Sequence, residues 1–148
     1  MLFRSVARQS LIPADDAKAG KVLLVGSLPS FFEEGKKRFA ETGDFKFSYE
    51  IGPNETQWVC DNIGKIVPAY DTIIVMVYSE RTARIAEWLK QYGKKTVVFS
   101  IMTPTNALPL DWADDIIVGY SYSDFTIKAM FGALTGEYKA EGKLPFTE

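Results

Sequence analysis

Four short runs of the sequence are apolar at nearly every position, which is typical of strands buried on both faces of a parallel sheet. These runs lie at residues 21–26, 72–78, 96–101 and 115–120. A fifth run, residues 45–51, alternates apolar side chains with polar ones. Alternation is typical of a strand with one covered face, so this run predicts a strand at the edge of the sheet.

The segments between these runs have apolar residues three and four positions apart, which predicts amphipathic helices. The spacing of Ser30 and Asn54 from acidic or amide side chains three residues later predicts capping boxes, and Ser79 and Ser123 predict simple N-caps. The connection 102–113 contains two prolines and predicts an extended loop or a single helical turn. The four predicted helices cover residues 30–42, 55–67, 80–92 and 124–135.

Strands that alternate with helices through right-handed crossovers predict an α/β fold, a three-layer αβα sandwich with a parallel five-stranded sheet. Placing the alternating strand at an edge gives the flavodoxin-like order 2-1-3-4-5. A chain of 148 residues has the length of one domain. We therefore expect residues 21–148 to form a single domain and residues 1–20 to be a linker or helix outside the sheet.

The composition disfavours several classes of partner and active site. Lys and Arg number 17 against 19 Asp and Glu, and no helix gathers them on one face, so nucleic acid is not an expected partner. The apolar runs are far shorter than the ~20 residues that cross a bilayer. Residues 1–4 do not have the pattern that begins a signal peptide, so a soluble chain is expected. The sequence has no histidine and Cys60 is its single cysteine, which disfavours metal sites and histidine-containing triads. We expect no metal and no cofactor.

In an open parallel sheet, ligands bind beyond the carboxyl ends of the strands, where several loops meet. The tyrosines and hydroxyls of 120–122 suit the apolar face and hydroxyl rim of a sugar. Glu80 stands at the same end, although the helix dipole alone explains an acidic residue in a first turn. The candidates for substrate contact or domain contact are Ser27, Tyr78, Glu80, Thr103, Asn106, Tyr120, Ser121 and Tyr122.

Other sites are disfavoured by residue type. The turn 26–30 has one glycine and a proline, which is a poor phosphate cradle. A phospho-receiver needs acidic residues where this chain has Ser27 and Tyr78. Asp114 and Asp115 form the most obvious carboxylate pair, but they precede the last strand, at the edge opposite the expected crevice, where solvated carboxylates are expected.

The carboxyl-terminal half contains residues that are recognisable beyond their pattern. They are an ADDII segment at 113–117, a YSYS run at 120–123, an ALTGE turn at 133–137 and an EGKLP segment at 141–145. Together these resemble the C-terminal domain of glycoside hydrolase family 3, particularly its β-N-acetylhexosaminidase branch. More loosely, residues 6–10 are similar to the helix that links the family's barrel to this domain, and residues 21–26 to its first strand. Thr135 departs from the apolar residue usual in that turn, and the loop 103–109 keeps only Thr103, Pro104 and Asn106 of an Asn-Pro-Tyr-like pattern.

The resemblance implies that the nucleophile lies outside this domain, because in that family it belongs to an N-terminal TIM-like barrel. The β-glucosidase branch draws its acid from the second domain, so Glu80 or Glu137 stays open as a donor to such a partner. We expect a non-catalytic accessory domain that packs on the barrel, lines its sugar site, contains no catalytic residue and is inactive alone. Such packing predicts an exposed apolar patch near the crevice and self-association without the partner. A stand-alone flavodoxin-like binding or signalling module is the alternative, and an independent hydrolase is a third possibility.

Overall fold

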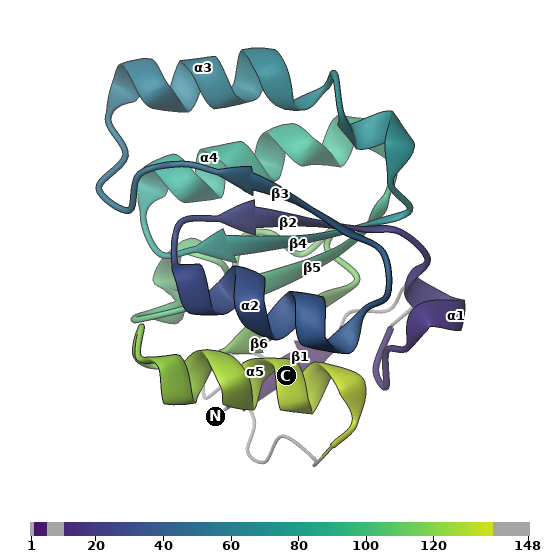
Figure 1. Ribbon diagram of the computed structural model, residues 1–148. Coiled ribbons are helices and arrows are strands. Elements are labelled where there is room, and N and C mark those ends of the chain that lie inside the picture. The colour runs from purple at the N-terminus through teal and green to yellow at the C-terminus, as the bar shows by residue number, and fades with distance from the viewer. Residues whose placement is uncertain (1, 6–10, 138–148) are drawn as a thin grey trace.

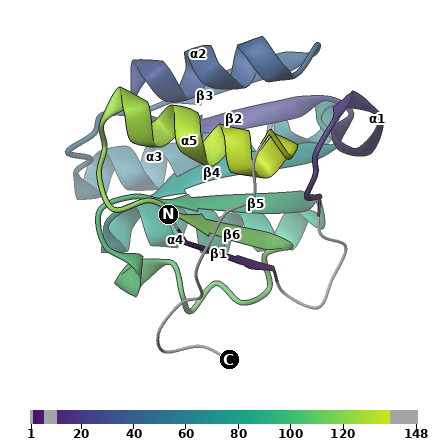
Figure 2. The same cartoon turned by 90° about the horizontal axis from the view of Figure 1, so that it is seen from below.

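The computed structural model describes residues 2–5 and 11–137, which form a sheet between two layers of helices (Figures 1 and 2). Five of the strands are parallel, and they lie in the predicted order, with the second strand of the five at one edge. The whole sheet has the order β1-β6-β5-β4-β2-β3. Its strands are β1 (Leu2–Ser5), β2 (Val22–Gly26), β3 (Thr42–Lys46), β4 (Thr72–Val77), β5 (Lys95–Ser100) and β6 (Asp115–Val118).

Strand β1 corrects the expectation that residues 1–20 lie outside the sheet. It pairs antiparallel with β6, in a register that sets Leu2 opposite Val118 and Ser5 opposite Asp115. This pairing gives hydrogen-bonding partners to an edge of β6 that would otherwise be open. Four residues are too few for an alternation of apolar and polar side chains to predict such a strand. Residues 6–10 and 141–145, which contribute to the family resemblance, lie outside the described residues.

Four long helices cover the two faces of the sheet (Figure 1). Helices α3 and α4 lie on one face, and α2 and α5 pack together on the other. The connection 102–113 contains one short 3-10 helix, within the range of what was predicted. Within the described part of the chain no helix is long and apolar enough to span a membrane. The helices are α1 (Asp16–Ala19), α2 (Pro29–Arg38), α3 (Pro53–Ile63), α4 (Glu80–Leu89) and α5 (Asp124–Thr135), with 3-10 helices η1 (Val67–Ala69), η2 (Lys90–Tyr92) and η3 (Pro104–Asn106).

The helix starts confirm two of the predicted caps and correct two others. Ser79 caps α4 in a reciprocal capping box with Thr82, and Ser123 caps α5. Helices α2 and α3 do not begin at capping boxes on Ser30 and Asn54. Each begins with a proline at its first position and has an N-cap that makes no side-chain hydrogen bond. Proline replaces the capping signal here because its fixed φ already suits the first helical turn.

The edge strand begins and ends earlier than the alternation of residues 45–51 predicts. Strand β3 runs over Thr42–Lys46 and pairs with β2 up to Gly26, where β2 ends. One further backbone bond, from Phe47 to Gly26, closes the ladder. The alternation beyond Lys46 therefore belongs to a loop that turns over the end of the sheet. There Phe47 is buried under α3 and α4, whereas Tyr49 packs toward the α2 and α5 side.

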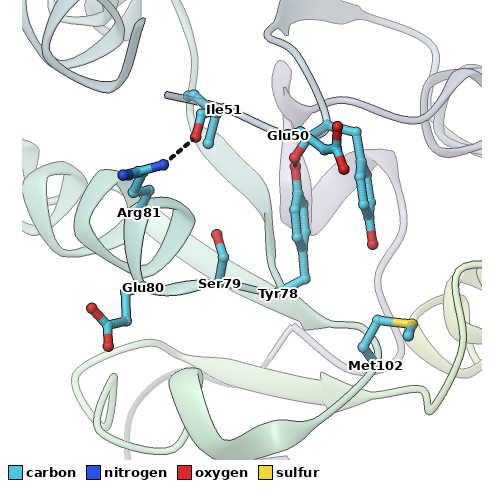
Figure 3. A pocket seen from close by; sticks show the side chains of 8 residues that line it. Glu50, Ile51, Tyr78, Ser79, Glu80, Arg81 and Met102 are labelled. Atoms are coloured by element: carbon cyan, nitrogen blue, oxygen red, sulfur yellow. Dashed lines mark hydrogen bonds between the residues drawn. The ribbon is translucent and has the colours of Figure 1, made fainter. Parts of the chain in front are cut away.

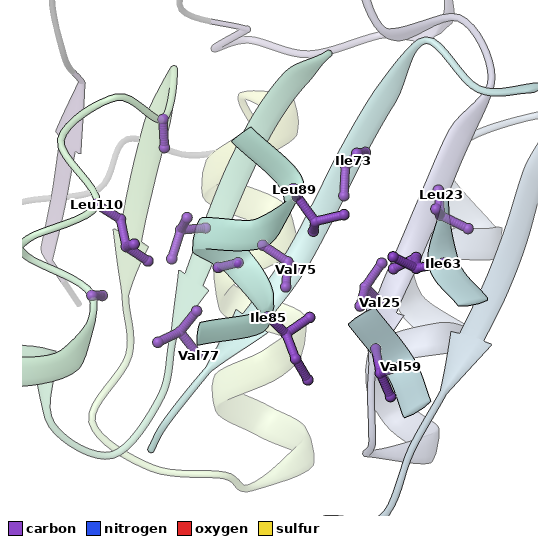
Figure 4. Packing of buried hydrophobic residues seen from close by; sticks show 14 of the residues in the cluster. Leu23, Val25, Val59, Ile63, Ile73, Val75, Val77, Ile85, Leu89 and Leu110 are labelled. Atoms are coloured by element: carbon purple, nitrogen blue, oxygen red, sulfur yellow. The ribbon is translucent and has the colours of Figure 1, made fainter. Parts of the chain in front are cut away.

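Two hydrophobic clusters, one on each face, hold the layers together. Successive strand residues alternate between the two clusters. Leu23 and Val25 face α3 and α4 (Figure 4), and Leu24 faces α2 and α5. On the face covered by α2 and α5, the ring centroid of Phe131 lies 4.7 Å from that of Phe99 and 5.6 Å from that of Phe31. Both clusters consist of side chains that are almost completely excluded from solvent.

The amino ends of the strands correct the expectation of solvated aspartates. Asp115 is fully buried, and its carboxylate accepts a hydrogen bond from the Leu11 amide at 2.8 Å. Asp114 accepts one from the Thr96 amide at 2.9 Å. These carboxylates satisfy backbone donors where strands begin, so they are structural groups at the edge opposite the expected crevice.

Two phenylalanines of α5 test this packing. Phe131 is fully buried and Phe125 is 83% exposed. We expect Phe131→Ala to lower the free energy of unfolding by about 3–5 kcal/mol, because it removes buried ring contacts and leaves a cavity. Phe125→Ala, on the same helix, should change it by less than about 0.5 kcal/mol. Urea denaturation followed by circular dichroism measures both, and equal effects of the two substitutions would contradict the packing described.

Candidate functional site

A pocket of about 590 Å³ opens at the carboxyl ends of the strands, which we call the carboxyl edge (Figure 3). The loop 47–52, which follows β3, forms one wall, and the start of α4 forms another. Met102, just after β5, has a positive φ of 72° and completes the lining. The residues that line this pocket are Tyr49, Glu50, Ile51, Tyr78, Ser79, Glu80, Arg81 and Met102.

Three tyrosines stand beside one another across the carboxyl edge, and we call them the tyrosine row. The rings of Tyr49 and Tyr78 are stacked, with centroids 4.4 Å apart and planes within 5°. The Tyr122 ring lies 6.1 Å from Tyr49 at an angle of 52°. The three side chains come from loops after β4, β3 and β6, and the last two strands are the outermost of the five parallel strands. The row therefore connects loops from opposite sides of the sheet.

The Tyr78 hydroxyl fixes this arrangement. It donates to the Tyr49 carbonyl at 2.7 Å and lies 3.0 Å from the Ser27 hydroxyl. A phenol has one hydrogen, so Ser27 is the donor in the second bond. Burial raises the pKa of Tyr78 to about 12, against the smaller lowering effect of the bond to Ser27. The structure thus brings the candidates Ser27 and Tyr78 together and uses their hydroxyls to hold the loop 47–52.

Two more hydrogen bonds hold the same loop. The Arg81 guanidinium donates to the Ile51 carbonyl at 3.0 Å (Figure 3). The Ser48 amide donates to the Glu55 carboxylate at 2.9 Å. Together with the bond from Tyr78, these contacts give the pocket a preformed wall.

Glu80 lies at the pocket as predicted, in the first turn of α4. Glu80 is exposed, and its carboxylate points away from Tyr78 (Figure 3). Glu137, the other candidate acid, lies at the far end of α5, where Arg38 binds it through two nitrogens at 2.8 and 3.2 Å. The hydrogen bond from Arg38 lowers the pKa of Glu137, whereas a general acid needs a raised pKa. Glu137 therefore lies at the wrong edge, in the wrong charge state, for proton donation to a ligand in this pocket.

The hydroxyl groups after β6 form a small network. Ser121 lies 2.6 Å from the Thr126 hydroxyl and 3.1 Å from that of Ser123. This network stabilises the start of α5, which Ser123 caps. The flanking Tyr120 and Tyr122 are 50% and 57% exposed. In the YSYS run the tyrosines thus keep exposed surface, while the serines form hydrogen bonds at the start of α5.

Thr103 and Asn106 are not among the residues that line the pocket. Thr103 is the N-cap of η3, and its carbonyl accepts a hydrogen bond from Ser100 at 3.4 Å. Asn106 is the last residue of η3. Within the described residues no group of three or more carboxylate, thiol or imidazole side chains is placed to hold a metal ion.

The sequence reasoning missed several residues at this edge. Tyr49 was predicted as part of an edge strand, and its alternation gave no sign of a wall around a pocket. Arg81 had no distinguishing pattern, and Met102 was hidden in an irregular loop. Phe125, 83% exposed in the first turn of α5, had one available signal, because it precedes the helix's apolar stripe rather than belonging to it.

Four large apolar side chains that are exposed lie at this edge, in the segments that follow β5 and β6. Met102 and Phe125 are 41% and 83% exposed, and the two tyrosines of the YSYS run are half exposed. We call Met102, Tyr120, Tyr122 and Phe125 the apolar patch. A monomer rarely leaves several large apolar side chains exposed at one place unless they meet a partner or a ligand.

The fold and this edge define an α/β domain with a preformed pocket and an apolar patch at the carboxyl ends of its strands. Solved structures with the same fold belong to larger carbohydrate-active enzymes. A glycoside hydrolase family 3 β-N-acetylglucosaminidase from Paenibacillus sp. str. FPU-7 superposes with a TM-score of 0.71 at 16% identity, over 97% of this chain and 30% of that chain. A fungal multi-domain GH3 β-N-acetylglucosaminidase gives a TM-score of 0.70 at 20% identity, over 95% of this chain and 17% of that one.

A β-glucoside phosphorylase, BglX, gives a TM-score of 0.64 at 16% identity, over 98% of this chain and 29% of that chain. No family model matches the sequence, and no curated protein does. This chain therefore spans less than a third of each of these enzymes and shares its fold with one part of them. The fold likeness agrees with the family resemblance stated from the sequence.

The Tyr78 hydroxyl gives a test of the preformed wall. An unfolded tyrosine ionises near 10, whereas burial holds the pKa of Tyr78 at about 12. The unfolded chain therefore loses this proton first, and the free energy of unfolding should fall as pH rises from about 10 to 12. In Tyr78→Phe this component of the pH dependence should disappear, and stability at neutral pH should fall by about 1 kcal/mol through the lost hydrogen bonds.

Urea denaturation across this pH range, with ultraviolet titration of tyrosinate, measures both effects. Tyr120→Phe is the matched control, because Tyr120 is half exposed and its hydroxyl has no described hydrogen-bond partner. A Tyr78→Phe variant with an unchanged alkaline stability profile would contradict the role given to this hydroxyl.

Proposed function

We propose that this chain is the non-catalytic accessory domain of a family 3 glycoside hydrolase of the β-N-acetylhexosaminidase type. In this proposal the domain is formed by residues 21–148, and residues 1–20 lead into it and add the strand β1. It packs through its carboxyl edge on a catalytic barrel and completes the rim of the barrel's sugar site. The sequence resemblance and the fold likeness to parts of larger family 3 enzymes support the proposal.

The observation that carries the proposal is the apolar patch. Burial of a single aromatic side chain such as Phe125 contributes about 1.5–3 kcal/mol, so several at one edge favour a protein surface there. The tyrosine row and the pocket lie at the same edge, and aromatic faces beside polar groups suit a sugar. An edge that binds a barrel and also forms part of its pocket rim combines both features.

The carboxylates of the pocket suit an accessory role. Retaining glycosidases need two carboxyl groups about 5–5.5 Å apart on either side of one bond, and the acid is held where its pKa is raised. Glu50 and Glu80 both line the pocket, but both are exposed to solvent. The bond-breaking groups are therefore proposed to belong to the partner.

The pocket at the carboxyl edge also favours a second candidate function. In this alternative the chain is a stand-alone module that binds a small ligand there. The preformed wall and the volume of about 590 Å³ favour this alternative. Stoichiometric binding of a flavin, or a rise in melting temperature with a nucleotide, would support it over the accessory domain.

The first experiment assays the purified chain with aryl N-acetylglucosaminide and aryl glucoside, where we expect no turnover. The second mixes the chain with the catalytic barrel of a family 3 β-N-acetylglucosaminidase and measures the complex by calorimetry. Phe125→Asp should weaken that complex by a factor of about 10 or more, because it puts a charge into an apolar contact. Trp58→Asp, at an aromatic on α3 that is 55% exposed, is the control and should leave the affinity unchanged. Turnover by the chain alone, or equal weakening by both substitutions, would overturn the proposal.

A further inference from the structure

Strand β3 leaves one edge of the sheet open. It is the last strand in the sheet order, and on its inner side it pairs with β2 (Figure 1). Within the described residues no strand pairs with its outer side. An open edge presents unpaired backbone N–H and C=O groups, which can pair with a strand of another chain. The side chains on β3 determine which strand can fit there.

The backbone groups of β3 that point outward can be identified from its bonds to β2. The Glu41 carbonyl accepts from the Val22 amide, and the Phe47 amide donates to the Gly26 carbonyl. Because backbone groups alternate in direction along a strand, the odd-numbered residues between these two also face β2. The even-numbered residues therefore direct their N–H and C=O groups away from the sheet. These residues are Thr42, Asp44 and Lys46.

Two of these residues carry opposite charges. Asp44 and Lys46 are two positions apart, so their side chains lie on the same face of the strand. The Asp44 Oδ2 lies 2.8 Å from the Lys36 ammonium of α2 and 3.8 Å from that of Lys46. The Asp44 Oδ1 is buried and has no hydrogen-bond partner among the described residues, and the Lys46 side chain is 65% exposed. The edge thus presents a carboxylate with an unused acceptor beside an exposed cation.

The other face of β3 is aromatic. Phe45 is partly buried against the cluster beneath α3 and α4, and its ring centroid lies 5.8 Å from that of Trp58. Trp58 belongs to α3 and is 55% exposed. Strands β4 and β2 separate these two rings from the segments that carry the apolar patch. The outer edge of the sheet therefore has an apolar surface of its own.

We propose that β3 pairs with β3 of a second copy of this chain, antiparallel, around a two-fold axis at Phe45. In this register Asp44 stands opposite Lys46 of the second copy, and the two residues exchange both of their backbone hydrogen bonds. Phe45 stands opposite Phe45 of the second copy in a non-hydrogen-bonded pair, where side chains approach most closely, and Trp58 lies beside it. This proposal does not depend on the accessory-domain function proposed above.

The charge pattern of β3 favours a second copy as the occupant. Charges on an edge strand usually prevent pairing, but here each charge meets an opposite one. Registers centred on Asp44 or on Lys46 would instead set like charges opposite each other. A two-fold axis is also the commonest symmetry of protein oligomers. Because the contact is confined to one short strand and its flanking ring, we expect a weak dimer with a Kd of about 10–100 µM.

Sedimentation velocity of the 148-residue chain, over concentrations of about 1–500 µM, measures this association. We expect the sedimentation coefficient to rise from that of a monomer toward that of a dimer. Lys46→Asp should weaken the dimer by a factor of about 10 or more, because aspartates then face each other in both charge pairs. Lys90→Asp makes the same charge change at an exposed residue of η2 and should leave the Kd unchanged.

A second variant separates strand pairing from folding. Asp44→Lys and Lys46→Asp should each self-associate more weakly than the wild-type chain. Mixed in equal amounts, the two should associate about as tightly as the wild type, because every facing pair is then opposite in charge. Asp44→Lys also removes the ion pair with Lys36, so circular dichroism melting checks that each variant is folded.

Phe125→Asp distinguishes this edge from the apolar patch and should leave the Kd of the dimer unchanged. A wild-type chain that stays monomeric over the whole range would leave the edge to some other strand and would refute the proposal. Failure of the two mixed variants to associate would refute it as well. So would loss of the dimer in Phe125→Asp together with its retention in Lys46→Asp.

Discussion

The architecture depends on one constraint, which is that the central strands are buried on both faces. Every residue of β2, β4 and β6 is buried. Such strands cannot carry polar side chains to solvent from either face, so a helix layer must cover each side and the chemistry is confined to the two ends of the strands. The two hydrophobic clusters, one under each helix layer, are the direct result. The position of the candidate site follows from this burial.

At the carboxyl edge, the loop 47–52 converts a row of strand ends into a pocket. It leaves the sheet at Lys46 because β2 has no residue left to pair with it. The loop is then held by the Tyr78 hydroxyl, just after β4, and by Arg81 in the first turn of α4. Stacking of Tyr49 on Tyr78 carries the aromatic surface toward Tyr122. A few side-chain contacts between neighbouring loops thus shape the wall of the pocket.

The sequence predicted the features that depend on periodicity and missed those that depend on pairing between distant segments. Five parallel strands and their order follow from buried runs between amphipathic helices, and the caps at Ser79 and Ser123 follow from local chemistry. The shift of β3 toward Gly43 was not predictable, because a glycine in a strand gives no apolar signal. The Tyr70 ring occupies the space where a side chain at Gly43 would lie, and this contact becomes visible only in three dimensions. Tyr49 was missed for the same reason, since its stacking partner is 29 positions away.

The two ends of the strands differ in how their charged and apolar side chains are used. At the amino ends, aspartates are used internally: Asp71 accepts from the Lys21 amide at 2.9 Å, and Asp115 from the Leu11 amide. At the carboxyl edge, Glu50 and Glu80 have no hydrogen bond or ion pair within the described chain, beside the exposed side chains of the apolar patch. Exposed carboxylates are hydrated and need no internal partner, so the apolar patch is the feature that a monomer rarely keeps at one place. Within the described residues, four of the six large apolar side chains that are exposed lie at the carboxyl edge, which supports the proposal that this edge is a packing surface.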